Sequence, residues 1–504
     1  MKLSTLFKLS ILSLSFLLSS VVIPRDAHAD FSSSAASQIS VGIDVNGDAE
    51  APSGETLEPV APANGNFIVF ASTAKNLTSD YLSGDTNYPT NIYRYSDTDG
   101  IQLLSKGENE ALPQNNGAGA TSLAPSVSEL LPDGSYVVAF QSDGTNMITD
   151  YTTPDQFSNP YQIYLYSSKL NRNILISFQE GSTTAGSSRN SYNPTVALLG
   201  TTPIKFRVCF EASANDLLDG GATGASEFGT IFCRIVRFND NSISVEDASR
   251  LIDNPSGGSL HRPFLSQDGK SLVFSSKAEI ITSISPNGFE QIYHHVFKTG
   301  VFSLISHTQD GAAAKGNSTY PSTTHKGNLV AFRYSPPSIG EGSADLESLE
   351  GTTRPVIVLG KKDTGDLTQI NASENSTASD GSGFAGKIDS GGRFVIFSDS
   401  GTNLLAEPSN SSQKTQVYVK DLKTSSIILA SKNATGTEGS DNSGDNGDSI
   451  NSNRQLPLTL VGTGQYKNSF MTSFISGADN LASIGDPDIY APYLFTTGIT
   501  IPPP

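Results

Sequence analysis

Short apolar runs that each end near a phenylalanine recur along the whole chain. The runs are rich in Val, Ile and Phe, and Gly, Asn, Asp and Ser separate them, which is the composition of β-strands joined by turns. An aliphatic residue or Met follows each phenylalanine by seven positions. The spacing therefore indicates seven copies of one structural unit. The copies are centred on Phe70, Phe140, Phe210, Phe274, Phe332, Phe397 and Phe474.

Each copy supplies four short strands. A second apolar pair follows the phenylalanine, from Ile92 and Tyr93 in the first copy to Ile489 and Tyr490 in the last, and a third run then ends in Ser in several copies. Ahead of the phenylalanine, a fourth strand opens with Pro in every copy but the sixth, where Gly386 takes its place. Turn pairs rich in Gly, Asn and Asp tolerate the φ > 0 of tight hairpins. No segment keeps a helical period of 3.6 residues.

Four-stranded units repeated in this way cover their sheet edges best when they close radially around an axis. We therefore predict an all-β fold, a single seven-bladed β-propeller with four-stranded antiparallel blades over residues 30–504. Residues 39–59 resemble residues 305–321, which link two copies, so the mature N-terminal strand is predicted to close the ring as an outer strand of the last blade. Residues 499–501 are the competing outer strand, and both strands could take part.

Three segments resemble the TolB-like, WD-repeat-related β-propeller family of exported bacterial proteins. They are residues 132–136 (PDGSY), 267–276 (QDGKSLVFSS) and 391–398 (GGRFVIFS). The resemblance, in looser form, spans residues 39–504 and implies the fold, but it says little about function. The repeats here are longer than those of TolB, and no residues remain for the separate amino-terminal domain of that protein, so a role in the Tol system is not implied.

The first 29 residues have the features of a secretory signal peptide. Lys2 and Lys8 precede an apolar stretch at 11–23, and an Ala-His-Ala cleavage site ends at Ala29. The apolar stretch is too short for a membrane span, which needs about 20 residues. We expect a periplasmic or secreted protein that does not insert into a membrane. A net charge of −18 disfavours nucleic acid and anionic lipid as partners.

The two cysteines, Cys209 and Cys233, fall on neighbouring strands of the third copy. An exported protein meets an oxidising environment, so this placement predicts a cross-strand disulfide. The alternative is a pair of buried thiols, because cysteine is also common in protein cores.

Candidate catalytic chemistry is sparse. The chain has no Gly-x-Ser-x-Gly, His-Glu-x-x-His or Cys-x-x-Cys motif. Five histidines lie between His261 and His325, and a metal site held by His261 and His307 would suit a lyase or hydrolase acting on a glycan. His294 and His295 are consecutive on one strand and therefore point to opposite faces. The alternative interpretation is that all five are ordinary surface histidines.

Calcium is the better candidate for a bound metal ion. Asp44, Asn46, Asp48 and Glu55 follow the spacing of an EF-hand loop, in which alternating oxygen ligands surround a hard cation. However, Ala49 replaces the usual glycine, so a solvated turn between blades is the alternative. A second acidic loop contains Glu438, Asp441, Asp445 and Asp448, and its alternative is a charged loop that keeps the surface soluble. No other cofactor is predicted.

Long polar loops are predicted to gather on one face of the propeller. Links from the second to the third strand, and from one blade to the next, emerge on the same face; the longest are residues 78–91, 106–124, 335–354 and 432–456. Long irregular loops are often functional, so this face is the expected binding surface. The leading hypothesis is a noncatalytic scaffold that binds an envelope protein or polysaccharide. The alternatives are the metal-assisted glycan lyase or hydrolase and a structural surface-layer component.

Overall fold

The computed structural model describes most of the region between residues 53 and 443 and several pieces of both ends. The gaps in the central region are 64–66, 80–88, 109–110, 116–117, 154–159, 219–224, 240–241, 254, 338–352, 406–412 and 434. The described pieces of the ends are 30–33, 37–38, 42–43, 49–50, 458–461, 469–476, 478, 481 and 491–500. The proposed signal peptide lies outside the described residues. No helix in the described part of the chain has the length and apolar character of a membrane span.

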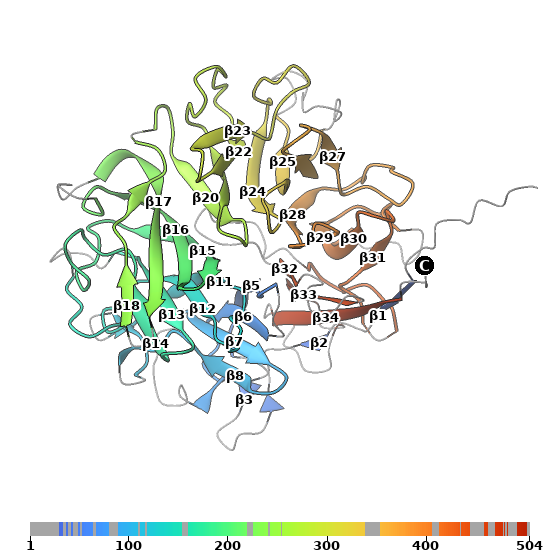
Figure 1. Ribbon diagram of the computed structural model, residues 1–504. Helices are drawn as coiled ribbons and strands as arrows, with labels where there is room; N and C mark the ends of the chain where they lie inside the picture. Colours follow the sequence, from blue (N-terminus) through green and yellow to red (C-terminus); the bar gives the residue numbers. More distant parts are fainter. Residues whose placement is uncertain are drawn as a thin grey trace, which may run out of the picture.

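In the described part of the chain, six antiparallel sheets of four or five strands each consist of consecutive strands, and we call them the first to sixth blades (Figure 1). The first is β5 (Thr56–Val60), β6 (Phe67–Ser72), β7 (Asn91–Ser96) and β8 (Gly100–Leu103); the second is β11 (Ser122–Val127), β12 (Val137–Ser142), β13 (Gln162–Ser167) and β14 (Arg172–Leu175). The third is β15 (Ser191–Thr201), β16 (Ile204–Ala214), β17 (Ala225–Asn239) and β18 (Ser242–Val245), with β19 (Ser249–Arg250) also paired to β17.

The remaining three blades have the same four-stranded order. The fourth is β20 (Leu260–Leu265), β21 (Ser271–Ser276), β22 (Gln291–Val296) and β23 (Val301–Leu304). The fifth is β24 (Asn317–Thr323), β25 (Leu329–Ser335), β26 (Val356–Lys361) and β27 (Leu367–Gln369), and the sixth is β28 (Gly383–Ile388), β29 (Phe394–Asp399), β30 (Gln416–Asp421) and β31 (Ile427–Leu429). Two small hairpins lie in the links, β3 (Gly42–Ile43) with β4 (Ala49–Glu50) and β9 (Gln114–Asn115) with β10 (Ala118–Gly119).

The last copy of the repeat lies in a sheet whose strands are not all consecutive in the chain. Its three strands, β32 (Leu458–Val461), β33 (Ser469–Ser476) and β34 (Ala491–Thr500), are joined by β1 (Asp30–Ser33) from the other end of the chain, and β2 (Ser37–Gln38) also pairs with β34. The described part of the chain therefore has six blades of the predicted kind, not seven, because β1 holds the fourth position in the sheet around Phe474. In this sheet β1 pairs antiparallel with the end of β34, with Phe31 opposite Ile499.

The innermost strands of all these sheets surround one axis. Each first strand contacts the first strand of the next blade, and β32 contacts β28 on one side and β5 on the other. Figure 1 shows β5, β11, β15 and β32 near the centre, while β8, β14, β18, β23 and β31 lie toward the rim. The predicted N-terminal strand at 39–41 lies outside the described residues. Residues 499 and 500 belong to β34, the strand with which β1 pairs.

The repeated phenylalanine occupies the same place in each blade. Phe70, Phe140, Phe210, Phe274 and Phe397 are fully buried on the second strand, and each stands opposite an aromatic residue of the third strand. The ring centroids of these pairs are 5.6 to 6.2 Å apart, a spacing at which aromatic pairs attract. The apolar positions that the sequence predicts as strands therefore lie on neighbouring strands of these blades.

In the fifth blade the residue opposite the phenylalanine is aliphatic: Phe332 stands opposite Val358, in the strand that begins with the predicted apolar residues 356–357. Phe474 stands opposite Tyr493, and the apolar residues predicted at 489–490 lie outside the described residues. Phe210 and Phe332 nevertheless occupy equivalent buried positions on the second strands of their blades.

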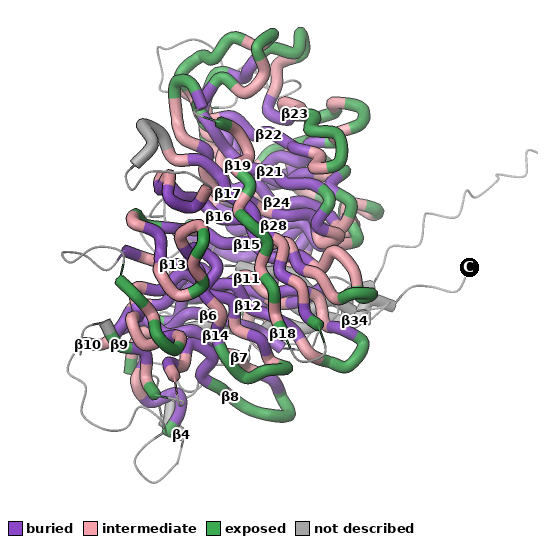
Figure 2. Tube along the Cα trace, turned by 60° about the vertical axis from the view of Figure 1, so that its left-hand side comes forward, coloured by how far each residue is buried: buried purple, intermediate pink, exposed green. Residues whose placement is uncertain are grey.

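The hydrophobic core lies between neighbouring blades. One cluster packs Phe206 and Phe210 of the third blade against Val137 and Leu165 of the second. Figure 2 shows the buried strands in the interior and exposed segments at the turns and links. Because each sheet buries its faces against the sheets beside it, no blade can form its core alone.

Every described innermost strand of the six blades contains a β-bulge near its start. In five of them a residue with positive φ precedes a proline, and the pairing register shifts at this point. The predicted opening prolines thus lie within the strands, where a missing N–H is tolerated. The positive-φ residues are Glu58, Ala124, Asn193, Arg262 and Tyr320. In the sixth blade Gly386 takes the proline position, and a Cβ there would lie 2.5 Å from Ile357 Cγ2.

Hydrogen bonds join three of the bulges, in the second, third and fourth blades, to the preceding blade. Glu58 Oε2 accepts the backbone N–H of Ala124 at 2.6 Å, and Glu211 Oε1 accepts that of Arg262 at 2.6 Å. Gln141 Oε1 accepts the N–H of Asn193 at 3.0 Å. These side chains satisfy buried amides that the bulges remove from the sheet ladders.

A second set of bonds lies one step further along the innermost strands. Here a hydroxyl oxygen of one blade accepts a backbone N–H of the next blade. The bonds run from Val196 N to Ser126 Oγ at 3.1 Å, from Leu265 N to Thr195 Oγ1 at 3.1 Å and from Ile388 N to Ser322 Oγ at 3.2 Å. Neighbouring blades are therefore fixed to one another at the axis as well as through their cores.

The structure contains the predicted cross-strand disulfide. Cys209 on β16 and Cys233 on β17 are directly opposite in the sheet and are bonded to each other. Both residues are buried, so the bond lies inside the third blade.

Removal of this disulfide is expected to destabilise the protein. The bond closes a loop with a sequence separation of 24, for which loop-closure entropy gives a stabilisation of about 3 kcal/mol. The C209A/C233A variant should therefore unfold at lower urea concentration than the oxidised wild type. A reducing agent should lower the midpoint of the wild type and leave that of the variant unchanged. Equal midpoints for wild type and variant without reductant would contradict the expectation.

Candidate functional site

Many polar side chains at the loop ends of the blades have structural roles. The serine that ends the predicted third run accepts the N–H at the start of the third strand, as Ser177 does from Ile163 at 2.9 Å, and donates to a side-chain amide oxygen, as to Gln162 at 2.6 Å. That glutamine also donates to Ser187 O in the next link at 2.9 Å. Blades four and six repeat the arrangement through Ser306 with Gln291 and Ser431 with Gln416.

The asparagine of the repeat also connects loops. Asn146 accepts the N–H of Gln114 at 2.8 Å and donates to Leu112 O at 2.9 Å, and Asn403 forms the same pair of bonds with Asp380 and Ala378. Each asparagine thus fixes the incoming link between blades to the loop after the second strand. Ser, Asn and Gln residues of this kind connect the loops to one another. The candidate functional groups of this face are therefore its charged residues.

A cluster of charged residues surrounds Arg262 on the innermost strand β20. Glu211, at the loop end of β16, accepts Arg262 N at 2.6 Å and Asn193 Nδ2 at 2.8 Å, and its Oε2 lies 3.1 Å from His261 Nδ1. The guanidinium carbon of Arg262 lies 4.0 Å from the ring centroid of Tyr320, and Arg262 Nη2 donates to Tyr320 Oη at 3.2 Å. The cluster draws on the third, fourth and fifth blades.

Glu290 completes the cluster from the loop that precedes β22. Its Oε1 accepts Ser275 Oγ at 2.5 Å and lies 3.6 Å from Arg262 Nη1. We call Glu211, His261, Arg262, Glu290 and Tyr320 the axial cluster. All five lie toward the face from which the long links emerge, because they flank the start of an innermost strand or the loop between second and third strands. The predicted loop face therefore carries charge near the axis.

His261 is the accessible titratable group of the axial cluster. Its side chain is 44% exposed, whereas that of Glu211 is 10% exposed. Burial opposes protonation of His261, but its hydrogen bond to Glu211 and the charges of Glu211 and Glu290 outweigh this effect and raise its pKa above 6.5. His261 is thus held as a proton donor that faces solvent, beside a cation–π pair and two carboxylates.

The other histidines have different environments, and not all of them are surface residues as predicted. His294 and His295 are buried between strands, and this burial lowers the pKa of each to about 4. His307 follows the outermost strand β23, whereas His261 lies on the innermost strand β20, so the two belong to opposite edges of the fourth blade. The Nδ1 atom of His307 lies 2.9 Å from Thr308 O. His325 lies in the predicted hairpin turn of the fifth blade, and its Nδ1 lies 3.7 Å from Glu129 Oε1 of the second blade.

The contact of His325 connects hairpins on the face opposite the axial cluster. His325 N donates to Ser390 O at 2.9 Å and Asp268 N donates to His325 O at 3.2 Å, so hairpins of the fourth, fifth and sixth blades are joined there. Burial raises the pKa of Glu129, with the charge of His325 acting in the opposite direction.

A further charged pair lies where the first and sixth blades approach the sheet of β32. Lys387 of β28 is buried, and burial lowers its pKa to about 8, although the charge of Glu58 on β5 acts in the opposite direction. Glu58 itself holds the N–H of Ala124. In the second, third and fifth blades the position of Lys387 is a Ser or Thr that bonds to the next blade, so this lysine replaces a structural hydroxyl with a charge.

The predicted calcium ligands fall mostly outside the described residues. Asp44, Asn46 and Asp48 lie there, in the segment between β3 and β4, while Glu55 is an exposed residue just before β5. Of the second acidic loop, Asp441 lies 3.2 Å from Lys414 Nζ, and Asp445 and Asp448 lie outside the described residues. In the described ranges no three His, Cys, Asp or Glu side chains form a group that could hold a metal ion. Calcium binding therefore stays a prediction.

Sequence reasoning missed the role of Glu211, Glu290 and Tyr320. They are not part of any motif, and Tyr320 and Arg262 were identifiable only as residues before the repeated proline. The cluster forms because equivalent positions in successive blades meet near the axis. Chemically it offers hydrogen-bond donors and acceptors of both charges, which suits recognition of a polar partner and also provides a histidine–carboxylate pair.

Comparisons with other proteins identify structures but no sequence relatives. No protein-family model and no curated protein matches the chain. A puromycin-hydrolysing peptidase of Mycobacterium tuberculosis aligns with 83% of this chain at 10% identity and a TM-score of 0.44, and the chain spans 49% of that protein. An oligogalacturonate lyase from Vibrio parahaemolyticus aligns over 93% of this chain and 98% of its own, at 10% identity and a TM-score of 0.44.

TolB from Acinetobacter baumannii is also similar in structure. The alignment covers 76% of this chain and 81% of TolB, at 12% identity and a TM-score of 0.30. Identity at this level does not indicate a shared function.

The pKa of His261 should depend on Glu211. In the wild type its NMR titration should have a midpoint above 6.5, whereas in E211Q the midpoint should fall below 6.5, because burial then dominates. The raised pKa means that protonated His261 stabilises the fold below about pH 6.5, and this contribution is lost as the pH rises through the folded pKa. E246Q, a matched change at a carboxylate that pairs with Arg237, is the control. An unchanged midpoint in E211Q would refute this assignment of the shift.

Proposed function

We propose that this chain is an exported, noncatalytic β-propeller that binds a protein or polymer of the cell envelope on its loop face. The observation that supports this function is the axial cluster, which presents His261, Arg262 and two carboxylates near the axis. Each charge has a partner within the protein, yet His261 stays 44% exposed. Groups that are preorganised by internal hydrogen bonds can contact a polar partner without the cost of ordering them.

Export is part of the same proposal. The leader at 1–29 would direct the chain to the periplasm or beyond, and a disulfide between Cys209 and Cys233 suits an oxidising compartment. Membership of the TolB-like family is likewise proposed, on the turn segments at 132–136, 267–276 and 391–398.

We further propose that the sheet of β32, β33 and β34 acts as a seventh blade that the mature N-terminus closes. Pairing of β1 with β34, and contacts of β32 with β28 and β5, support this closure. A ring in which strands from both ends of the chain pair within one sheet resists opening, because that pairing must break before the ring can open.

A metal-assisted lyase or hydrolase acting on a glycan is the second candidate function. The observation in its favour is the half-exposed His261 next to Glu211, since histidine–carboxylate pairs serve as general acids and bases. Elemental analysis separates the two candidates. Manganese, iron or zinc at one equivalent would favour the enzyme, and a metal-free protein that retains its partner would favour the scaffold.

Partner recovery from envelope extract tests the proposed function. The H261A variant should recover at least tenfold less partner than the wild type, because it removes the exposed donor of the axial cluster. The matched control is H325A, which removes a histidine of similar exposure, 46%, from the opposite face. Loss of recovery with H325A but not with H261A would place the binding surface on the hairpin face and contradict the proposal.

A further inference from the structure

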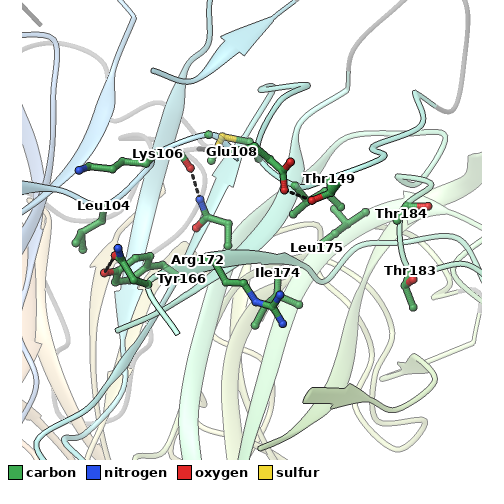
Figure 3. A pocket seen from close by; sticks show the side chains of 15 residues that line it. Leu104, Lys106, Glu108, Thr149, Tyr166, Arg172, Ile174, Leu175, Thr183 and Thr184 are labelled. Carbon is green, nitrogen blue, oxygen red and sulfur yellow. Dashed lines mark hydrogen bonds between the residues drawn. The ribbon is translucent and has the colours of Figure 1, made fainter. Parts of the chain in front are cut away.

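The pocket of about 470 Å³ beside the outermost strand β14 does not offer one surface to a ligand (Figure 3). Side chains alternate along a strand, so Arg172 and Ile174 point to one side of β14, whereas Asn173 points to the other side and donates to Lys106 O at 2.6 Å. Glu108 lies on the side of Asn173, so the two charged groups of the lining do not face each other.

Two buried histidines of the fourth blade, by contrast, share one arrangement. We call the packed contact between two neighbouring blades a joint. Ile292, two residues before His294 on β22, packs into the core shared with the fifth blade, and Tyr293, two residues before His295, packs into the core shared with the third blade. Alternate residues of a strand point to the same face. Each joint of the fourth blade therefore contains one of the two imidazole rings, and both residues are buried.

His294 faces the hairpin turns of the fifth blade. Its Nδ1 and Nε2 atoms are buried, and neither forms a hydrogen bond with the described residues. A Cβ on Gly327, in the turn between β24 and β25, would lie 3.0 Å from Nε2, so this turn covers the ring closely. The charged groups on this side are Lys362 and Asp363 in the turn after β26, whose Nζ and Oδ1 atoms lie 3.1 Å apart.

His295 faces aromatic rings and a cation in the joint with the third blade. Its ring centroid lies 4.4 Å from that of Phe302 and 5.1 Å from that of Phe297. The guanidinium carbon of Arg207, on β16 of the third blade, lies 3.6 Å from the Phe297 ring centroid. The Nδ1 atom of His295 is buried and has no hydrogen-bond partner among the described residues. This joint therefore already holds one positive charge.

The surroundings of both histidines favour the neutral imidazole. Burial lowers the pKa of each to about 4, and the charges of Lys362 and Arg207 add to this effect in their respective joints. Asp363 and the backbone of Gly327 act in the opposite direction on the fifth-blade side. On the third-blade side, the charges of Asp268 and Glu246 act on Arg207.

We propose that His294 and His295 make the propeller sensitive to acid at the fourth blade. Protonation places a second cation in each joint of this blade, beside Lys362 on one side and Arg207 on the other. The contacts that hold the fourth blade between its neighbours are thereby weakened. The axial cluster draws on the same three blades, so acid takes this cluster apart as well. The property does not depend on what the loop face binds.

The direction of the pH dependence follows from the lowered pKa values. Each neutral histidine favours the native state fully above about pH 6.5, and this contribution is lost as the pH falls through the folded pKa of about 4. Each should raise the unfolding equilibrium constant by roughly 50- to 100-fold between about pH 7.5 and pH 4.5. His261 acts in the opposite direction, because its pKa is raised.

Urea unfolding at about pH 7.5 and pH 4.5 tests the proposal. Acidification should raise the unfolding constant of H294Q and of H295Q by roughly 50-fold less than that of the wild type, and that of the double variant by still less, because glutamine does not titrate. The matched control is H307Q, the same change at a partly exposed histidine that follows β23. It should lose as much stability on acidification as the wild type.

A second measurement needs no variant. Hydrogen–deuterium exchange at the histidine Cε1 position, followed by mass spectrometry, reports the protonation of each imidazole in the wild type. His294 and His295 should stay neutral in the folded protein down to about pH 5. Protonation of either near pH 6.5 in the folded protein would overturn the proposal. An equal loss of stability in the wild type, H294Q and H295Q would also overturn it, because carboxylates would then be the cause of the acid sensitivity.

Discussion

The fold depends on hydrogen bonds that pass from blade to blade around the axis. Each bulge in an innermost strand removes an amide from its own sheet, and a buried amide without a partner costs about 1–3 kcal/mol. In the second, third and fourth blades the preceding blade supplies the acceptor, as Glu58 does for Ala124 and Glu211 for Arg262. Hydroxyl groups add a second set of bonds, as from Val196 to Ser126. The amides are therefore satisfied only when the neighbouring blades are in place, and the same neighbours bury the aromatic faces of the sheets.

This constraint also explains where the charged residues lie. A bulge turns the side chain before the proline toward the neighbouring blades, so polar residues at that position meet near the axis. Glu211, on the second strand β16, has two roles: it accepts the backbone N–H of Arg262 at the next bulge and it raises the pKa of His261. The axial cluster is thus built on the joints of the ring, and a partner bound there would contact three blades at once.

Much of the fold could be predicted from the sequence, because the repeated phenylalanine marks the second strand of each blade and its aromatic partner marks the third. The number of blades made of consecutive strands could not be predicted. The pairing of β1 with β34 joins residues from the two ends of the chain, so it leaves no local pattern in the sequence. The position of the prolines inside the innermost strands was missed, because a strand pattern does not reveal a bulge.

Of the candidate site, the sequence predicted only that it lies on the face of the propeller that carries the long loops. Glu211, Glu290 and Tyr320 come together although they are about 30 to 110 residues apart in the chain, and no short sequence motif contains them. The separation of His261 from His307 likewise follows from the blade geometry, which sets one at the axis and the other beyond an outermost strand.

Native-state hydrogen exchange tests the central claim most directly. The amides of Ala124, Asn193, Arg262, Val196, Leu265 and Ile388 form the bonds between blades. If these bonds hold the ring together, the six amides should exchange only through global unfolding and should be among the slowest in the protein. They should also share one free energy of opening, because one blade cannot release them without its neighbours. Exchange of these amides as fast as that of the outermost strands β14 and β18, or with separate free energies in each blade, would contradict the account.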